Sequence, residues 1–156
     1  MKIALIGHGA MGQLVAKLAA ERHHEVVLTL DEPDATRPTA ELSAELSECE
    51  VAIDFSVAAA VQRNIELCML AEVPLVVGTT GWKIDRNELV RTVEEAEGAL
   101  LYGANFSVGA QVFFRIAARA AERPRSTGFP SGLAARSPSA IIPIVCPLTS
   151  AIISHT

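Results

Sequence analysis

The stretch that decides the fold is residues 2–12, KIALIGHGAMG, in which a short apolar run leads directly into three closely spaced glycines. The run KIALI has the length and composition of a strand that is buried on both faces of a sheet. Gly7, Gly9 and Gly12 fit the spacing G-x-G-x-x-G, and apolar residues recur at helical spacing across residues 11–18. The sequence therefore predicts a strand, a tight glycine turn and a helix in immediate succession.

A glycine turn in this context is typical of dinucleotide-binding folds. The first glycine permits the tight turn, the second lets a pyrophosphate approach the backbone, and the third lets the helix pack closely on the strand. The free N–H groups at the helix N-terminus offer donors and positive potential to the phosphates. We interpret His8 as an exposed residue at a variable position of the glycine motif, from which it can also touch the cofactor. The predicted cofactor turn comprises Gly7, His8, Gly9, Ala10, Met11 and Gly12.

An acidic residue follows the second expected strand, EVVLTL at residues 25–30. Asp31 lies 19 residues after the last glycine of the turn, where dinucleotide-binding folds place a carboxylate on the adenosine ribose hydroxyls. Glu32 and Asp34 add negative charge nearby, so a 2′-phosphate would be repelled. We therefore predict NADH as the preferred cofactor, with NADPH possible, because Arg37 would offset the repulsion if its loop folded back.

Strands and helices alternate along the rest of the chain. Further strands are expected at residues 51–55, 74–77 and 99–102, and further helices near residues 40–46, after Ser56 and Asp85 as N-caps, and after Ser107. Such alternation predicts parallel strands joined by right-handed helical crossovers. The expected fold class is α/β, with a doubly wound parallel sheet of the Rossmann dinucleotide-binding type.

The composition changes abruptly near residue 122. All 18 acidic residues lie at or before Glu122, whereas residues 123–156 contain no acid and no lysine and hold five of the eight prolines. The first 122 residues carry a net charge of −8 and the remainder +3. We therefore expect a dinucleotide-binding domain at residues 1–122 and an irregular, disordered C-terminal tail at residues 123–156.

Several classes of protein are disfavoured. The chain is acidic and has no basic cluster, so we expect no nucleic-acid partner. No apolar run has the length of a membrane span or the pattern of a signal peptide. Cys49, Cys68 and Cys146 form no C-x-x-C motif, which argues against a zinc site or a disulfide framework. We expect a cytoplasmic protein with reduced thiols and no metal.

Three further segments lie at the carboxyl ends of expected strands: DFSV at residues 54–57, VGTTGW at 77–82 and YGANFSVG at 102–109. Open α/β sheets bind ligands at this edge. Together and in this order, the segments resemble the dihydrodipicolinate reductase family, and the resemblance covers about residues 1–122. It implies that the glycine turn binds the pyrophosphate and that Asp31 meets the ribose. It also implies that the nicotinamide side is lined by Gly78, Thr79, Thr80, Gly103, Ala104, Asn105 and Phe106.

The resemblance also implies an activity and a second domain. The family are NAD(P)H-dependent oxidoreductases of lysine and diaminopimelate biosynthesis, which reduce the cyclic dicarboxylate 4-hydroxy-tetrahydrodipicolinate. Their second domain binds substrate through a His-His pair, a lysine and a Pro-Ser-Gly-Thr segment, and it builds a homotetramer. No lysine follows Lys83, the only later histidine is His155, and the Pro-Ser-Gly at residues 130–132 is read as coincidence. No catalytic residue is therefore identifiable. We expect a truncated form that binds cofactor without turnover and does not form the family's homotetramer.

Three alternatives remain open from the sequence. The chain could belong to another two-domain dehydrogenase of the aspartate or homoserine type, although GTTGW and ANFSVG argue against this. It could be a non-catalytic NAD-binding module, which the missing histidines and lysine favour. It could also be a structural or interaction protein that uses the apolar tail as a docking segment.

Overall fold

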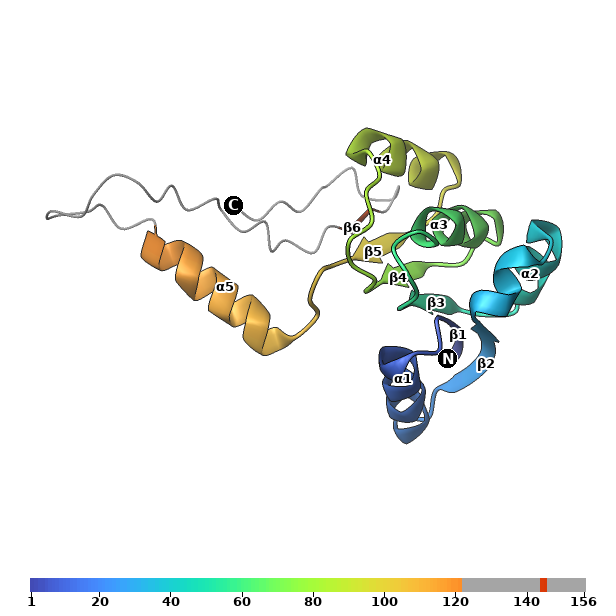
Figure 1. The fold of residues 1–156 in the computed structure, drawn as a ribbon, viewed down its shortest axis with the longest axis horizontal. Coiled ribbons are helices and arrows are strands. Elements are labelled where there is room, and N and C mark those ends of the chain that lie inside the picture. Colours follow the sequence, from blue (N-terminus) through green and yellow to red (C-terminus); the bar gives the residue numbers. More distant parts are fainter. Residues whose placement is uncertain (122–143, 146–156) are drawn as a thin grey trace, which may run out of the picture.

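A six-stranded sheet with the strand order β2-β1-β3-β4-β5-β6 organises the chain (Figure 1). The structure, a computed structural model, describes residues 1–121 and 144–145. Strands β1 to β5 run parallel, and β6 is antiparallel to β5. The strands are β1 (Lys2–Ile6), β2 (Glu25–Leu30), β3 (Val51–Asp54), β4 (Leu75–Val77), β5 (Leu100–Tyr102) and β6 (Ile144–Val145).

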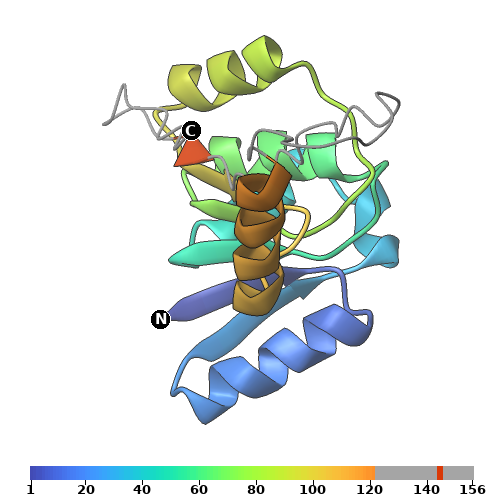
Figure 2. The same cartoon turned by 90° about the vertical axis from the view of Figure 1, so that its left-hand side faces the viewer.

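Helices cover the sheet on both faces, as the doubly wound prediction requires. Helix α1 lies on one face and α2, α3 and α4 lie on the other (Figures 1 and 2). Helix α5 extends away from the end of β5 and stands in front of the sheet in Figure 2. The helices are α1 (Ala10–Glu21), the 3₁₀ helix η1 (Glu32–Thr36), α2 (Thr39–Leu46), α3 (Val61–Leu70), α4 (Arg86–Glu95) and α5 (Val108–Ala121).

Strand β1, between β2 and β3, contributes side chains to two core clusters, one on each face of the sheet. Successive side chains of a strand point to opposite faces. Ile3 and Leu5 therefore pack with Ala19 under α1. Ala4 and Ile6 face the larger cluster beneath α2, α3 and α4. Burial on both faces explains why the N-terminal strand is an uninterrupted apolar run.

The strand order places β1 between β2 and β3, so the chain changes direction across the sheet there. Ligands of open α/β sheets bind beyond the carboxyl ends of the strands at such a switch point. The parallel ladder continues one residue past the strands: Gly7 N–H donates to Leu30 O at 2.8 Å, and Gly78 N–H donates to Asp54 O at 2.8 Å. The loops after neighbouring strands therefore begin side by side along one edge, which we call the carboxyl edge.

Two local predictions met different outcomes. Asp85 caps α4 as predicted, because its carboxylate accepts from the backbone N–H groups of Asn87 and Glu88. The prediction that Ser56 caps the next helix is wrong: α3 begins at Val61, with Ala60 in the N-cap position. Ser56 instead donates its hydroxyl to Asp54. The nearby carboxylate competes with the helix for this side chain.

Most of the apolar residues that predicted two of the helices are exposed. Of the α1 residues Met11, Leu14, Val15 and Leu18, only Val15 packs against the sheet, beside Ala16 and Ala19. On α5, Val112, Phe113 and Ile116 are 50% to 65% exposed. Within the described residues, neither core cluster includes a residue of α5.

Most of the predicted irregular tail lies outside the described residues. Its Ile144–Val145 segment forms β6 on the edge strand β5, an element that the sequence analysis did not expect. In the part of the chain that the structure describes, no helix is long and apolar enough to cross a membrane. The same residues contain no group of three or more His, Cys, Asp or Glu side chains placed to hold a metal ion.

Candidate functional site

The candidate site is a row of loops along the carboxyl edge. The strand order places the segment from Asp31 first, then the glycine turn at residues 7–9, then the loops at residues 55–60, 78–85 and 103–107. Neighbouring strands lie about 4.8 Å apart, so the first and fourth loops begin roughly 14 Å apart. The row therefore has the extent of a long, thin ligand that lies across the strand ends.

Two of the three glycines in the turn have no room for a side chain. Gly7 has a φ of +92°, and a Cβ there would lie 2.6 Å from the carbonyl oxygen of Phe55. A Cβ on Gly12 would lie 2.1 Å from the carbonyl oxygen of Gly7. Any larger residue at Gly7 or Gly12 would therefore push the turn away from β3 or from its own helix.

Gly9 differs from the other two glycines, because a Cβ there would meet nothing within 4 Å. The first hydrogen bond of α1 runs from Gln13 N–H to Gly9 O at 3.0 Å. The amides of the first turn, from Ala10 to Gly12, therefore have no acceptor within the helix. Open space beside free amides at the positive end of a helix suits an anionic group.

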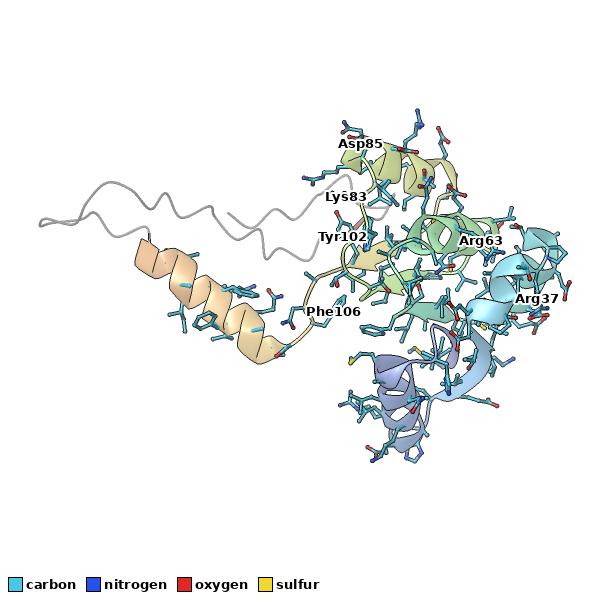
Figure 3. All side chains as sticks on the ribbon, in the orientation of Figure 1. Arg37, Arg63, Lys83, Asp85, Tyr102 and Phe106 are labelled. Atoms are coloured by element: carbon cyan, nitrogen blue, oxygen red, sulfur yellow. The ribbon has the colours of Figure 1, made fainter. Side chains whose placement is uncertain are left out.

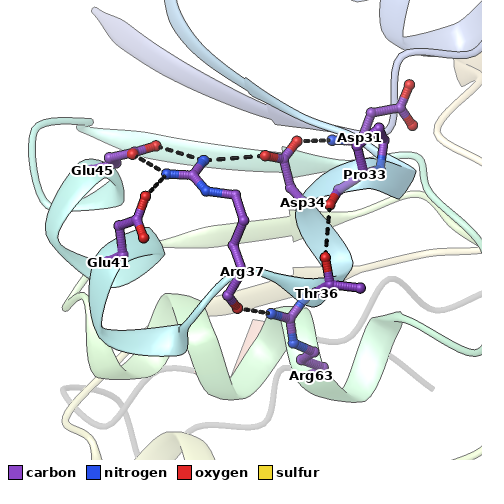
Figure 4. Close-up of polar contacts among 8 residues, drawn as sticks. All are labelled: Asp31, Pro33, Asp34, Thr36, Arg37, Glu41, Glu45 and Arg63. Carbon is purple, nitrogen blue, oxygen red and sulfur yellow. Dashed lines mark hydrogen bonds and ion pairs between the residues drawn. The ribbon is translucent and has the colours of Figure 1, made fainter.

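Asp31 begins a loop that is closed by a cluster of charged side chains (Figure 4). The Asp31 N–H donates to the Asp34 carboxylate at 2.9 Å. Arg37 donates to the other Asp34 oxygen at 3.1 Å and to both Glu41 and Glu45 of α2. We call Asp34, Arg37, Glu41 and Glu45 the Arg37 cluster. The carboxylate of Asp31 is exposed and has no hydrogen bond to another described side chain.

The Arg37 cluster shifts the pKa values of two groups, Asp34 and Arg37. The Asp31 N–H, and then the Arg37 guanidinium, hold the pKa of the Asp34 carboxyl below its usual value. Hydrogen bonds to Glu45, then to Glu41 and Asp34, raise the pKa of the Arg37 guanidinium. The Arg37 side chain is 29% exposed, and its charged head lies beside α2 (Figure 4). The loop folds back as considered above, but its cation is bound to three carboxylates.

A buried carboxylate joins the next two loops of the row. Asp54, fully buried at the end of β3, accepts on Oδ1 from the Ser56 N–H at 2.8 Å, the Ser56 hydroxyl at 2.7 Å and the Thr79 hydroxyl at 2.6 Å. Its Oδ2 accepts from Nδ2 of Asn64 on α3 at 2.8 Å. We call Asp54, Ser56, Asn64 and Thr79 the Asp54 junction. Four donors satisfy the buried carboxylate, so it needs no cation partner.

Phe55 packs between the glycine turn and the following loop. Its backbone lies against Gly7, and its ring lies against Gly78, where a Cβ would be 2.1 Å from the ring carbon Cε1. Gly78 is therefore the residue that lets the Phe55 ring close the gap between two loops. Asp54, Phe55 and Asn64 were not predicted as site residues from the sequence. The sequence signal that could have identified Asp54 is its place as the last residue of an apolar strand, where side chains are buried.

The loop after β4 presents Thr80 to solvent and keeps Thr79 inside. Thr79 is buried and donates to Asp54, whereas Thr80 is exposed. The indole N–H of Trp82 donates to the Thr79 carbonyl at 2.8 Å. The Trp82 ring also meets Tyr102 edge to face, with centroids 5.2 Å apart and planes at 66°. The first contact closes the loop after β4, and the second fastens this loop to the end of β5.

The last loop of the row leads into α5. Gly103 N–H donates to Val77 O at 3.1 Å. The Asn105 Oδ1 accepts from the Ser107 N–H at 2.8 Å, so this side chain shapes the entry to α5. Ala104, Asn105 and Phe106 are exposed. Within residues 1–121 and 144–145, no hydrogen bond joins them to the glycine turn or to residues 78–80.

The predicted site residues thus lie along the row rather than in one closed pocket. Figure 3 shows Tyr102 and Phe106 toward the side from which α5 departs, and Arg37 on the opposite side near α2. The structure brings Gly7, Phe55 and Gly78 into contact. His8 is exposed, and its carbonyl accepts from the Gln13 side chain at 3.2 Å.

Known proteins are similar to this chain in sequence. The family model described as dihydrodipicolinate reductase, N-terminus, matches residues 1–106. A 4-hydroxy-tetrahydrodipicolinate reductase of Christiangramia forsetii is 37% identical over 116 residues, which are 74% of this chain and 46% of that protein. The enzyme of the same name from Staphylococcus aureus strain JH9 is 38% identical over 128 residues, 77% of this chain and 50% of that protein. The chain therefore spans about half the length of these relatives.

Solved structures show the same fold at low sequence identity. Dipicolinate-bound dihydrodipicolinate reductase from Paenisporosarcina sp. TG-14 aligns with a TM-score of 0.64 and 22% identity, covering 78% of this chain and 53% of that one. A probable dehydrogenase from Thermotoga maritima aligns with a TM-score of 0.57 and 14% identity, covering 78% and 41%. The fold, the loops of the carboxyl edge and the family match over residues 1–106 lead to one conclusion: the chain belongs to the dihydrodipicolinate reductase family, of which it carries the N-terminal, Rossmann-type part.

Proposed function

We propose that this chain is the cofactor-binding half of an NADH-preferring 4-hydroxy-tetrahydrodipicolinate reductase, a cytoplasmic oxidoreductase of lysine and diaminopimelate biosynthesis. The observation that carries the proposal is the order of the loops along the carboxyl edge. An acidic residue, an open helix N-terminus and a loop with an exposed hydroxyl follow one another over roughly 14 Å. An extended dinucleotide presents a ribose, a pyrophosphate and a nicotinamide in the same order.

Each part of the row has a proposed role. The amides of Ala10 to Gly12 bind the pyrophosphate, which Gly9 admits because the space beside it is open. The exposed carboxylate of Asp31 accepts hydrogen bonds from the adenosine ribose hydroxyls. The nicotinamide side is formed by Gly78, Thr79, Thr80, Gly103, Ala104, Asn105 and Phe106.

The preference for NADH follows from the charges around Asp31. A 2′-phosphate would lie close to Asp31 and to the neighbouring carboxylates of Glu32 and Asp34. Arg37 is the cation in this loop, and its guanidinium is already bound to Asp34, Glu41 and Glu45. A cation held by three carboxylates has little attraction left for a phosphate, so the loop repels the extra charge of NADPH.

Cofactor binding without turnover is the second part of the proposal. When bound, the nicotinamide supplies the hydride, and the protein must supply a proton and donors for two substrate carboxylates. The residues proposed to bind the cofactor orient it, but none of them is a lysine or an arginine. The His-His and lysine block that the family resemblance leads one to expect is absent from this sequence. This feature also favours the second candidate, a non-catalytic NAD-binding module.

The test uses Gly9→Leu, because this glycine has the open space and a φ of −71° that any residue adopts. The variant should fold like the unmodified chain, yet its side chain would fill the space proposed for the pyrophosphate. We expect NADH affinity to fall by at least a hundredfold, measured by titration calorimetry, with unchanged circular dichroism. Ala20→Leu, at an exposed position of the same helix, is the matched control.

Turnover is measured on the same preparations as substrate-dependent NADH oxidation. We expect none from the unmodified chain. Steady oxidation that requires 4-hydroxy-tetrahydrodipicolinate would contradict this second part and favour the reductase over the binding module. If Gly9→Leu bound NADH with the affinity of the unmodified chain, the proposed binding of the pyrophosphate beside Gly9 would be wrong.

A further inference from the structure

The Asp54 junction connects the loop after β3 with the loop after β4, and the proposed cofactor would touch the second of these loops. Asp54 lies on the side of β3 that is covered by α3, and none of its surface is exposed. It therefore cannot contact a ligand at the carboxyl edge. Every hydrogen-bonding neighbour of its carboxylate is a donor, from the loop after β3, from α3 and from the loop after β4.

We propose that Asp54 is a positioning residue for the nicotinamide half of the cofactor, acting through the Thr79 hydroxyl on the loop that carries Thr80. The inference rests on the proposed function, which did not include Asp54. The Thr79 hydroxyl is the donor by which the loop after β4 reaches the carboxylate. Its position fixes which side of the loop faces inward, and the next residue, Thr80, consequently faces out.

The backbone around Thr79 is held at three points. Gly78 N–H donates to Asp54 O at 2.8 Å, the Thr79 hydroxyl donates to the Asp54 carboxylate at 2.6 Å, and Trp82 donates to the Thr79 carbonyl at 2.8 Å. Two of the three contacts are made by Asp54. A loop held in this way has few conformations left to lose when a ligand binds, which strengthens binding without adding a contact.

A carboxylate is the group that this arrangement requires. Both of its oxygens accept and neither donates, so it can receive the Thr79 hydroxyl, the two Ser56 donors and the Asn64 amide at once. A side-chain amide would present N–H groups to at least one of these donors. The junction therefore selects aspartate at a position where a buried charge would otherwise be unfavourable.

The adenosine half of the site is held by other contacts. The glycine turn is tied to β2 through the bond from Gly7 N–H to Leu30 O, and the Asp31 loop is closed by the Arg37 cluster. Neither set of contacts uses the Asp54 carboxylate. Loss of a hydrogen bond in the Asp54 junction should therefore weaken the binding of the nicotinamide. The binding of the adenosine diphosphate portion should stay unchanged.

The experiment compares two ligands on the full 156-residue chain: NADH, and ADP-ribose, which lacks the nicotinamide. Thr79→Val removes the hydroxyl at nearly constant volume, whereas Thr79→Ser keeps it. We expect Thr79→Val to weaken the binding of NADH roughly tenfold, which is the equivalent of one hydrogen bond to a charged group. The same variant should weaken the binding of ADP-ribose less than twofold. Thr79→Ser should bind NADH within about twofold of the unmodified chain.

Thr92→Val is the matched control, because Thr92 donates its hydroxyl to the Glu88 carbonyl within α4, away from the carboxyl edge. This variant should bind both NADH and ADP-ribose with unchanged affinity. Equal weakening of NADH and ADP-ribose by Thr79→Val would overturn the proposal, since it would show a general loss of structure. An unchanged NADH affinity would also overturn it.

Hydrogen exchange separates this proposal from the proposed function. Thr79→Val should accelerate amide exchange at residues 56–60 as well as at 78–82, because both loops depend on one carboxylate. If the unmodified chain bound neither ligand, the proposed function would fail, and exchange would still test the junction. Acceleration confined to residues 78–82 would overturn the coupling between the loops.

Discussion

Arg37 lies close to the proposed ribose position, but its guanidinium is bound to carboxylates of the protein. Its guanidinium and the Asp31 N–H both contact the Asp34 carboxylate, at 3.1 and 2.9 Å. The cation is therefore close to the proposed ribose position while it is bound to Glu41 and Glu45. A second tie, from Arg63 on α3 to the Arg37 carbonyl at 3.2 Å, fixes the backbone beneath it.

Releasing Arg37 should change the cofactor preference. In the double variant Glu41→Gln/Glu45→Gln two of its three carboxylate partners lose their charge, so the guanidinium becomes available to a 2′-phosphate. We expect NADPH affinity to rise about fivefold, or roughly 1 kcal/mol, while NADH affinity stays within twofold. Titration calorimetry with both cofactors provides the measurement.

Glu94→Gln/Glu95→Gln, at two exposed positions of α4, controls for the change in net charge, because it also removes two carboxylates, both outside the Arg37 cluster. An equal gain of NADPH affinity in this control would assign the effect to overall charge. No gain in the double variant would mean that Asp31, Glu32 and Asp34 alone set the preference.

Among the elements, the best predicted are those that are determined by residues close to them in the sequence. The strands at residues 2–6 and 25–30 were predicted at their observed bounds, because both are apolar or alternating runs that end at turn residues. The cap of α4 was predicted because Asp85 needs only the amides two and three residues ahead. The failure at Ser56 has a non-local cause, since its hydroxyl is taken by a carboxylate that is ordered by α3 and the loop after β4.

The cofactor-binding role of the site residues stays a prediction, but part of their local geometry follows from the sequence. The glycine turn and Asp31 follow from spacing, and the structure gives Gly7, Gly9 and Gly12 the three different environments that the spacing implies. The Asp54 junction could not be predicted, because it joins residues 10 and 25 positions apart in the sequence, Asn64 with Asp54 and Thr79 with Asp54. Their meeting depends on the pairing of β3 with β4.

The cap gives a prediction for α4 as an element. Asp85→Ala removes an acceptor for the N–H groups of Asn87 and Glu88 and also a charge that favours the helix N-terminus. We expect a loss of about 1 kcal/mol in the free energy of unfolding, measured by urea denaturation. Asp85→Ser, which retains an acceptor, should restore most of the loss. If the serine variant is as unstable as the alanine variant, the cap does not account for the effect.

For the molecule as a whole, Cys68 offers a probe of global unfolding. This α3 thiol is fully buried, and burial, followed by the negative charge of Asp54, raises its pKa to about 12. The thiolate is the reactive form, so at pH 8 only about one molecule in ten thousand presents it. We expect Cys68 to resist alkylation in the native chain, as followed by peptide mapping.

Labelling of Cys68 should begin only where circular dichroism detects unfolding in urea, and the two transitions should coincide. Stability should also fall as the pH rises above about 9, because the unfolded chain then ionises a thiol that the folded chain keeps protonated. Rapid labelling of Cys68 without denaturant would show that α3 opens separately from the rest of the sheet.

The position of β1 between β2 and β3 also has a consequence for synthesis. β1 precedes both of its neighbours in the chain, and it needs one on each side. Its partner β2 ends at Leu30, but its other partner β3 does not begin until Val51. At a translation rate of about 5–20 residues per second, one edge of β1 waits unpaired for roughly 1–4 seconds. During that interval the nascent chain exposes an apolar strand edge, which makes this segment a natural site for chaperone contact.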